Sequence, residues 1–295
     1  MKDCVQRYFV DWESQSTEAA VNEAGLELAL QELDALIGLR TVKDSVRTSA
    51  NFARIQMRRA GRGLVTVSRS FHTVFSGNPG TGKTSVARLM GKIYKALGVM
   101  SKGYVVECDR SKLVAEYIGQ TAVKTNAVID SALDCVLFID AAYSLAQPGE
   151  GRRLWKDFGQ EAIEVLLKRM EDDRRRPIVI VAGYTHEMQE FIAANPGLKS
   201  RFANQIEFPD YSPEELVQIF IATAGEKGLA CTPPFRDALI QKRREIFANK
   251  GLNFGNARDI RNLFEATSKN QGNRLVFLSN ATDDDFQKLL PVDLP

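Results

Sequence analysis

Cysteine is scarce in this chain, and its spacing argues against the common cysteine sites. The four cysteines are Cys4, Cys108, Cys135 and Cys231, and no two of them form a CxxC pair, so we predict no cysteine metal site. Cys108 and Cys135 lie in apolar, strand-like runs, where a small buried thiol is a better interpretation than a disulfide. The two histidines are far apart in the sequence, and nothing near them indicates a histidine-based site.

Long apolar runs and an excess of one charge are also missing. No run approaches the roughly 18–20 apolar residues that a membrane-spanning helix needs. The N-terminal segment MKDCVQRYFVDWESQ carries acids and lacks the apolar core of a signal peptide. A formal net charge of +2 gives no general attraction to nucleic acid or to an anionic membrane. We therefore expect a cytoplasmic protein with neither nucleic acid nor a membrane as its partner.

Short apolar runs alternate with helical patterns through the middle of the chain. The runs that we expect to be strands are HTVFS (72–76), YVVECD (104–109), CVLFID (135–140) and PIVIVAGY (177–184). The last two are continuously apolar, as is typical of parallel strands buried on both faces. The alternation predicts an α/β domain in which helices flank a parallel sheet.

The two ends of the chain are predicted to be helical. Residues 1–33 carry an amphipathic pattern that we expect to form a helical arm outside the core fold. Residues 212–295 begin with a Ser-x-x-Glu capping box, Ser212 to Glu215, and continue with helical patterns, so they predict a small all-α domain. Because 295 residues suggest about two domains, we place the α/β domain at 34–211, between the arm and the helical domain.

A glycine-rich segment provides the strongest functional signal. GNPGTGKT (77–84) fits the pattern G-x-x-x-x-G-K-[ST], whose backbone N–H groups surround phosphate oxygens. A simple glycine-rich turn is disfavoured, because the segment follows an expected strand and opens an expected helix. In this motif the lysine reaches the β- and γ-phosphates and the hydroxyl ligates Mg²⁺. The predicted ATP contacts are Asn78, Pro79, Gly80, Thr81, Gly82, Lys83 and Thr84.

The end of the CVLFID strand supplies an acid for the same site. Asp140 follows this buried run about 60 residues after the glycine-rich segment, and a carboxylate there can hold Mg²⁺ directly or through water. A structural acid at a strand end is the alternative. The sequence therefore predicts a P-loop protein that binds ATP with Mg²⁺ through Thr84 and Asp140.

Eight segments of the chain follow one another in an order known from one protein family. They are GNPGTGKT, EYIGQTAVKT, VLFIDAAYSL, FGQEAIEVLLKRMED, VAGYTHEM, NPGLKSRF, FPDYSPEEL and FGNARDIRNLFE. In these segments, residues 34–275 resemble the CbxX/CfxQ family of AAA+ ATPases, which includes the red-type Rubisco activase CbbX and relatives of the proteins SpoVK and EccA. The resemblance implies a P-loop NTPase fold with a helical lid domain. It also implies a homo-oligomeric ring, a hexamer, that couples ATP hydrolysis to pulling on a protein client.

One departure from the family pattern concerns the chemistry. The family has FIDEAYSL where this chain has FIDAAYSL, so Ala141 occupies the place of the Walker B glutamate. That glutamate orients and activates the attacking water, and alanine can do neither. We expect ATP binding to survive and hydrolysis to be strongly impaired. Either the change was introduced deliberately or the chain is a natural inactive member, and the intact neighbours of Ala141 favour an introduced change.

Two arginines match the residues that complete an AAA+ site. Arg201 in KSRF matches the arginine finger, which reaches the γ-phosphate held by the neighbouring subunit. The alternative is a solvated charge near a strand start. Arg258 in GNAR matches the sensor-2 arginine, which contacts ATP in the same subunit. The alternative is a surface arginine that pairs with Asp259 or Glu265.

Further nucleotide contacts are implied by the same resemblance. Ile37, Gly38 and Leu39 precede the fold where the family contacts adenine. The sensor-1 position, at the end of the PIVIVAGY strand, is filled by Tyr184 or Thr185, and the sequence does not choose between them.

Two loops match the substrate-gripping parts of threading ATPases. Tyr117-Ile118-Gly119 lies between two expected helices and matches the aromatic–apolar–glycine pore loop, although a loop aromatic can also be packed in a core. An aromatic ring on such a loop can grip an extended chain without reading its sequence, and the glycine provides a hinge. A second polar loop, Gln147 to Arg153, is expected deeper in the same pore.

A local basic cluster leaves two interpretations. It consists of Arg54, Arg58, Arg59, Arg62 and Arg69, and it is either a solvated face or a docking site for an acidic partner. A sugar-phosphate effector of the kind that Rubisco activases use is a further candidate for the same cluster.

Two functions from different classes fit these observations. The first is an ATP-driven protein remodeller whose hydrolysis is disabled here, and the second is a non-hydrolysing, ATP-dependent assembly scaffold that recruits partner proteins. A nucleic-acid motor is disfavoured by the near-neutral charge and by an aromatic pore loop.

Overall fold

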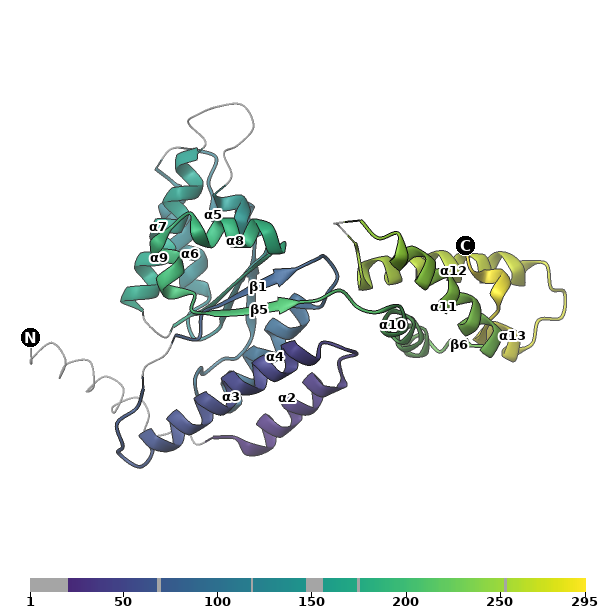
Figure 1. Ribbon diagram of the computed structural model, residues 1–295, viewed down its shortest axis with the longest axis horizontal. Coiled ribbons are helices and arrows are strands. Elements are labelled where there is room, and N and C mark those ends of the chain that lie inside the picture. The colour runs from purple at the N-terminus through teal and green to yellow at the C-terminus, as the bar shows by residue number, and fades with distance from the viewer. Residues whose placement is uncertain (1–20, 68–69, 118, 147–155, 174–175, 252–253) are drawn as a thin grey trace, which may run out of the picture. The chain divides into compact units, whose positions relative to one another are not determined.

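The computed structural model describes residues 21–67, 70–117, 119–146, 156–173, 176–251 and 254–295, and these residues form two compact units (Figure 1). The first unit contains residues up to 35, 40–76 and 83–207. The second unit contains residues 208–295 together with two short segments from earlier in the chain, 36–39 and 77–82.

A five-stranded sheet forms the centre of the first unit. Its strands are β1 (Thr73–Gly77), β2 (Val105–Cys108), β3 (Val136–Ile139), β4 (Ile178–Gly183) and β5 (Asn204–Phe208), in the order β2-β3-β4-β1-β5. The pairs β2–β3, β3–β4 and β4–β1 are parallel. Every residue of β3 and β4 is buried, as their unbroken apolar runs predicted. The predicted parallel α/β sheet is therefore confirmed.

Helices connect the strands and cover the sheet. They are α4 (Lys83–Ala96), α5 (Arg110–Leu113), α6 (Thr121–Ser131), η1 (Ala142–Leu145), α7 (Lys156–Asp172), α8 (Thr185–Ala193) and α9 (Pro196–Arg201). The helix that we expected over SKLVAEY ends early at Leu113, because Val114 adopts an extended backbone. The buried core between these helices and the sheet includes Leu137, Val179 and Phe202.

Two N-terminal helices, α2 (Glu23–Ala35) and α3 (Arg40–Ala60), also belong to the first unit. Helix α2 buries Leu26, Ala29 and Leu33, which follow one another at helical spacing, and it packs against α4. Residues 23–33 of the predicted arm therefore pack within this unit rather than outside its core. The apolar stripe of such a helix is visible in the sequence, but the sequence does not show which other element packs against it.

The second unit is a small helical bundle. Its elements are α10 (Pro213–Glu226), β6 (Ala230–Cys231), α11 (Pro233–Ala248), α12 (Ala257–Val276), α13 (Asp283–Gln287), β7 (Lys288–Leu289) and η3 (Pro291–Asp293). The predicted capping box at Ser212 and Glu215 is present. Phe220 packs against Phe235 and Phe264 with ring centroids 5.4 and 5.7 Å apart. The parallel pair β6–β7 was not predicted, since two-residue strands are too short to show an alternating pattern.

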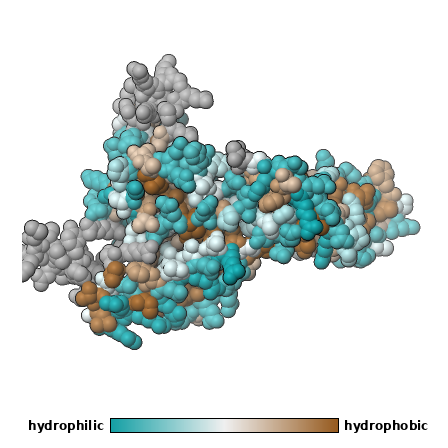
Figure 2. All heavy atoms as spheres, in the orientation of Figure 1, coloured by the Kyte–Doolittle hydropathy of each residue, from teal (hydrophilic) through white to brown (hydrophobic). Residues whose placement is uncertain are grey.

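The face drawn in Figure 2 carries both polar and apolar side chains. On the face drawn in Figure 2, hydrophilic residues dominate and apolar side chains appear in separate groups. Within the part of the chain that the structure describes, no helix has the length and apolar character to cross a membrane.

Candidate functional site

The glycine-rich segment adopts the strand–loop–helix arrangement that phosphate binding requires. It follows β1, and α4 begins at Lys83, so Lys83 and Thr84 lie in the first turn of a helix whose N-terminus favours anions. Gly77, Gly80 and Gly82 have φ values of 144°, 72° and 91°, a region that side chains avoid. A Cβ atom on Gly77 would lie 2.3 Å from the Phe208 carbonyl oxygen. The loop therefore needs glycine for both conformation and space.

The segment 36–39 lies beside the same loop, and both belong to the second unit. Leu39 is buried, and one of its methyl groups lies 3.4 Å from where a Cβ of Gly82 would be. Gly38 has a φ of 63° and lies against the carboxylate of Glu215. The predicted adenine contacts at Ile37, Gly38 and Leu39 therefore lie in a segment that borders the loop, and their role stays a prediction.

Asp140 and Ala141 lie at the same edge of the sheet as Lys83 and Thr84. Strands β1 and β3 belong to one parallel sheet with β4 between them, so the residues after β1 and after β3 leave the sheet at the same edge. Asp140 is exposed, and its Oδ1 accepts a hydrogen bond from the Ala141 N–H at 3.0 Å. A carboxylate at this edge matches the oxygen ligands that Mg²⁺ prefers.

Ala141 has an unusual backbone for a residue other than glycine. Its φ and ψ are 47° and 44°, and it precedes the short helix η1. Its carbonyl accepts a hydrogen bond from the Ser144 N–H at 2.9 Å, which fixes this turn directly after Asp140. The methyl group of Ala141 can neither accept a proton from water nor orient one.

Both sensor-1 candidates follow the strand between β1 and β3. β4 ends at Gly183, Tyr184 caps α8, and Thr185 is the first residue of that helix. The ring of Tyr184 lies 5.8 Å from the ring of Tyr143. The pKa of Tyr143 is raised mainly by burial and, to a smaller extent, by the neighbouring Tyr184. Both candidates thus leave the sheet at the edge that carries Asp140.

Arg201 lies at the opposite edge of the sheet. Its carbonyl accepts a hydrogen bond from the Ser70 hydroxyl at 3.1 Å, and Ser70 lies before the amino end of β1. Lys83 follows the carboxyl end of that strand, and five strand residues span about 16 Å. The guanidinium has only long contacts, 3.4 Å to Glu171 and 3.4 Å to the Gly197 carbonyl, and its buried Nε has no partner among the described residues.

Arg258 lies at the start of α12, close to the loop. The backbone nitrogen of Arg258 is 2.7 Å from where a Cβ of Gly80 would be, and its side chain is exposed. Among the described residues, no ion pair joins Arg258 to Asp259 or Glu265. Asp259 instead accepts a hydrogen bond from the Gly255 N–H at 3.0 Å. The surface ion pair that we considered for Arg258 is absent there.

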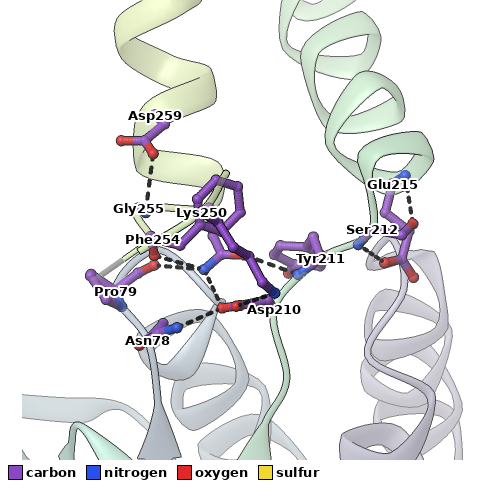
Figure 3. A network of polar contacts seen from close by, with 11 residues as sticks. Asn78, Pro79, Asp210, Tyr211, Ser212, Glu215, Lys250, Phe254, Gly255 and Asp259 are labelled. Atoms are coloured by element: carbon purple, nitrogen blue, oxygen red, sulfur yellow. Dashed lines mark hydrogen bonds and ion pairs between the residues drawn. The ribbon is translucent and has the colours of Figure 1, made fainter. Parts of the chain in front are cut away.

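Sequence analysis missed one part of this site, which Figure 3 shows in detail. Asp210 accepts hydrogen bonds from the side chains of Asn78 and Asn256 at 2.9 and 2.8 Å, and Lys250 contacts its other oxygen at 2.9 Å. The available signal was Asn256 in the GNAR motif, of which we had interpreted only the arginine, Arg258.

The predicted pore loop lies between α5 and α6. Tyr117 is 68% exposed, so it is not a packed core aromatic. Gly119 has a φ of 80° and no atom within 4 Å of where its Cβ would be. Ile118 and the second loop, Gln147 to Arg153, lie outside the described residues.

The basic cluster, of which Arg69 lies outside the described residues, is partly neutralised within the first unit. Arg54 and Arg58 form ion pairs with Glu23 at 2.5 and 3.1 Å, and Arg59 donates to the Val65 carbonyl. These contacts favour the solvated face over a docking site. In the described residues, no group of three or more histidine, cysteine, aspartate or glutamate side chains could hold a metal ion. The Mg²⁺ roles of Thr84 and Asp140 stay predictions.

Comparisons with solved structures identify the fold. The AAA domain of FIGL-1 superimposes with a TM-score of 0.60 at 17% identity, covering 88% of this chain and 80% of that chain. The Thermotoga maritima RuvB Holliday junction branch migration motor superimposes with a TM-score of 0.55 at 20% identity, covering 86% of this chain and 69% of that chain. At these identities the likeness concerns the fold alone.

Sequence comparisons identify the family. Residues 73–210 match the ATPase family associated with various cellular activities (AAA), and residues 212–295 match an AAA lid domain. The stage V sporulation protein K of Bacillus subtilis is 39% identical over 90% of this chain and 81% of its own length. Protein CbbX of Cereibacter sphaeroides is 43% identical over 88% of this chain and 83% of its own length. The ESX-1 secretion system protein EccA1 of Mycolicibacterium smegmatis is 42% identical over 90% of this chain but only 47% of its own length. The chain therefore belongs to the AAA ATPases of the type represented by CbbX, stage V sporulation protein K and EccA.

Proposed function

We propose that this chain is the subunit of a cytoplasmic ATP-dependent ring, a homo-hexamer, that remodels a protein client and whose hydrolysis is impaired by Ala141. The observation that carries the proposal is the position of Arg201. It lies at the amino edge of β1, about 16 Å of strand away from Lys83 at the carboxyl edge. Because this arginine cannot easily reach the phosphates of its own chain, a role there requires a second copy. A heterologous contact that closes on itself gives a ring.

Each residue of the site then has a distinct role toward ATP. The loop from Asn78 to Gly82 surrounds the phosphates, and Lys83 neutralises their charge. Thr84 and Asp140 would hold Mg²⁺, which would supply positive charge that offsets the negative charge of the phosphates. Leu39 and its neighbours contact adenine, Arg258 contacts the nucleotide from the lid, and Tyr184 or Thr185 acts as sensor 1.

The exposed position of Tyr117 supports client binding. A ring that is 68% exposed, on a loop whose glycine has nothing near it, is available to contact another chain. Gripping of a threaded client by Tyr117, Ile118 and Gly119 therefore fits the exposed position. A Rubisco-activase-like client and a sugar-phosphate effector are inferences from the family resemblance alone.

Ala141 itself favours one other function, a non-hydrolysing scaffold that assembles partner proteins when ATP is bound. The Ala141→Glu variant distinguishes the two. For the remodeller we expect ATP turnover at least about a hundredfold faster than in the unchanged chain, equivalent to about 2.7 kcal/mol of activation free energy. Steady-state phosphate release measures this ratio, and equal rates would contradict the assignment of position 141.

A mixing experiment tests the shared site. Ala141→Glu/Arg201→Ala subunits keep their own phosphate loop but lack the arginine finger, and Lys83→Ala subunits keep Arg201 but should not bind ATP. Each variant alone should be inactive, and a mixture should recover part of the turnover, because one subunit supplies Arg201 to the other. If no mixing ratio restores turnover, Arg201 does not act between subunits.

A further inference from the structure

Four consecutive residues of the phosphate-binding loop are held by other residues of the second unit, to which the loop itself belongs. The Asn78 side chain donates to Asp210, and the Pro79 carbonyl accepts from the Asn256 amide at 3.3 Å. The Gly80 carbonyl accepts from the Ala257 N–H at 3.2 Å, and the Thr81 carbonyl accepts from the Tyr211 hydroxyl at 3.4 Å. We call the residues Asp210, Tyr211, Asn256 and Ala257 the loop clasp. Figure 3 shows its contacts with Asn78 and Pro79.

The direction of these bonds determines where the loop N–H groups point. In a planar trans peptide the C=O and the N–H of the same unit point in opposite directions. Because the carbonyls of Pro79, Gly80 and Thr81 face the loop clasp, the N–H groups of Gly80, Thr81 and Gly82 face away from it. These are N–H groups of the kind that surround phosphate in such loops.

Asn256 is the central residue of the loop clasp. It is fully buried, and its Oδ1 accepts from the Tyr211 N–H at 2.9 Å. Its Nδ2 contacts the Pro79 carbonyl, Asp210 and the Phe254 carbonyl, the last at 3.0 Å. The side chain thus connects the loop, the strand exit at residues 210–211 and the start of α12.

The backbone conformation of Asn256 is strained, which indicates that its side chain has a role. Its φ of 49° and ψ of −126° are costly for any residue with a Cβ and suit glycine. Glycine would relieve the strain but would lose every side-chain bond. Asparagine at this position therefore costs stability locally and provides contacts that converge on the phosphate-binding loop.

From this geometry we infer that Asn256 and Asp210 are positioning residues for nucleotide binding, which set the orientation of the loop N–H groups from outside the loop. This inference rests on the proposed binding of ATP at that loop. Asp210 accepts from both asparagines, so it aligns Asn256 with Asn78. Burial raises the pKa of Asp210, but the hydrogen bonds from Asn256, Lys250 and Asn78 together lower it by more. The net pKa lies below the ordinary carboxyl value, so the carboxylate is ionised.

The Asn256→Gly variant separates this role from a structural one. It removes the side chain while relaxing the backbone, so relief of strain offsets part of the lost hydrogen bonding, and we expect a melting temperature closer to that of the parent chain than the melting temperature of Asn256→Ala. Binding of fluorescent N-methylanthraniloyl-ADP should weaken at least about tenfold, through loss of hydrogen bonds that order the loop. Asn256→Ala, which keeps the strain, should weaken binding similarly and also lower the melting temperature.

Arg244→Gln is the matched control. Arg244 forms an exposed ion pair with Glu214 at 2.9 Å and belongs neither to the loop nor to the loop clasp, so its variant should bind the labelled ADP within about threefold of the parent chain. An Asn256→Gly protein that binds ADP as tightly as the parent would overturn the inference. A parent chain that binds neither ADP nor ATP would instead contradict the proposed function, so the two failures are distinguishable.

Discussion

The loop that follows β1 and the loop that carries Tyr117 are opposites in their surroundings. Gly80 and Gly119 both have positive φ values, 72° and 80°. A Cβ on Gly80 would lie 2.2 Å from the Gly255 carbonyl oxygen, whereas a Cβ on Gly119 would meet nothing within 4 Å. The first loop is fixed by its neighbours, which suits a ligand of constant shape such as a phosphate chain. In the second, Tyr117 and Gly119 are open to solvent, which suits a partner whose side chains vary.

The largest effect should come from adding one methyl group to each loop. Gly80→Ala forces the loop away from Gly255 and should weaken ADP binding about a hundredfold, because an ångström-scale shift misplaces several phosphate contacts at once. Gly119→Ala meets open space, and we expect ADP binding within about twofold of the parent. Titration of both variants with labelled ADP checks the contrast, and similar losses would show that the two loops do not differ in restraint.

A smaller effect on the fold is expected when the exposed ring is removed. Tyr117→Ala should change the free energy of unfolding by less than about 0.5 kcal/mol, because the ring is largely in solvent. In an Ala141→Glu background, basal ATP turnover should persist while client-stimulated turnover is lost. Melting temperature and phosphate release measured on one preparation test this. A destabilised variant with weak ATP binding would remove Tyr117 from the client-binding proposal.

Acid should affect the stability of the first unit and the clasped loop of the second unit over different pH ranges. Burial, and secondarily Arg201, lowers the pKa of His72 to about 4, and its Nδ1 accepts from the Val179 N–H at 3.0 Å. In the unfolded chain His72 takes up a proton as the pH falls through about 6.5, whereas in the folded chain it stays neutral until about pH 4. The contribution of His72 to the free energy of unfolding is therefore fully present above about pH 6.5 and is lost as the pH falls toward about 4. Between pH 7 and pH 5 we expect a loss of about 2 kcal/mol.

Asp210 titrates in the same direction but at lower pH, because its pKa is lowered in the folded protein from a carboxyl value that is already acidic. Its stabilisation is present above the ordinary carboxyl pKa and is lost only below about pH 4. ADP affinity should therefore be insensitive to Asp210 between pH 7 and pH 5, while the urea midpoint falls over the same range. His72→Asn should flatten the fall in stability, and a parallel loss of ADP affinity and stability would contradict this separation.

Local patterns made much of this molecule predictable. The buried strands β3 and β4 were predicted because their apolar residues are contiguous, and the turn at Gly77–Thr84 because each residue type serves the motif. The loop clasp was missed because its bonds join residues that are far apart in the sequence, such as Asn78 with Asp210 and Pro79 with Asn256. The same limit applies to α2, whose apolar stripe was visible but whose partner α4 was not.

The location of Arg201 at the far edge of the sheet has a consequence for how activity depends on the concentration of the protein. If every site borrows its finger from a neighbour, an isolated chain is catalytically incomplete, even with glutamate restored at position 141. Specific activity would then rise with protein concentration and collapse on dilution, well before any chain unfolds. A small fraction of subunits without ATP-binding activity and without Arg201 would inactivate more sites than their own number, because each of them also leaves the site of the neighbouring subunit without its arginine.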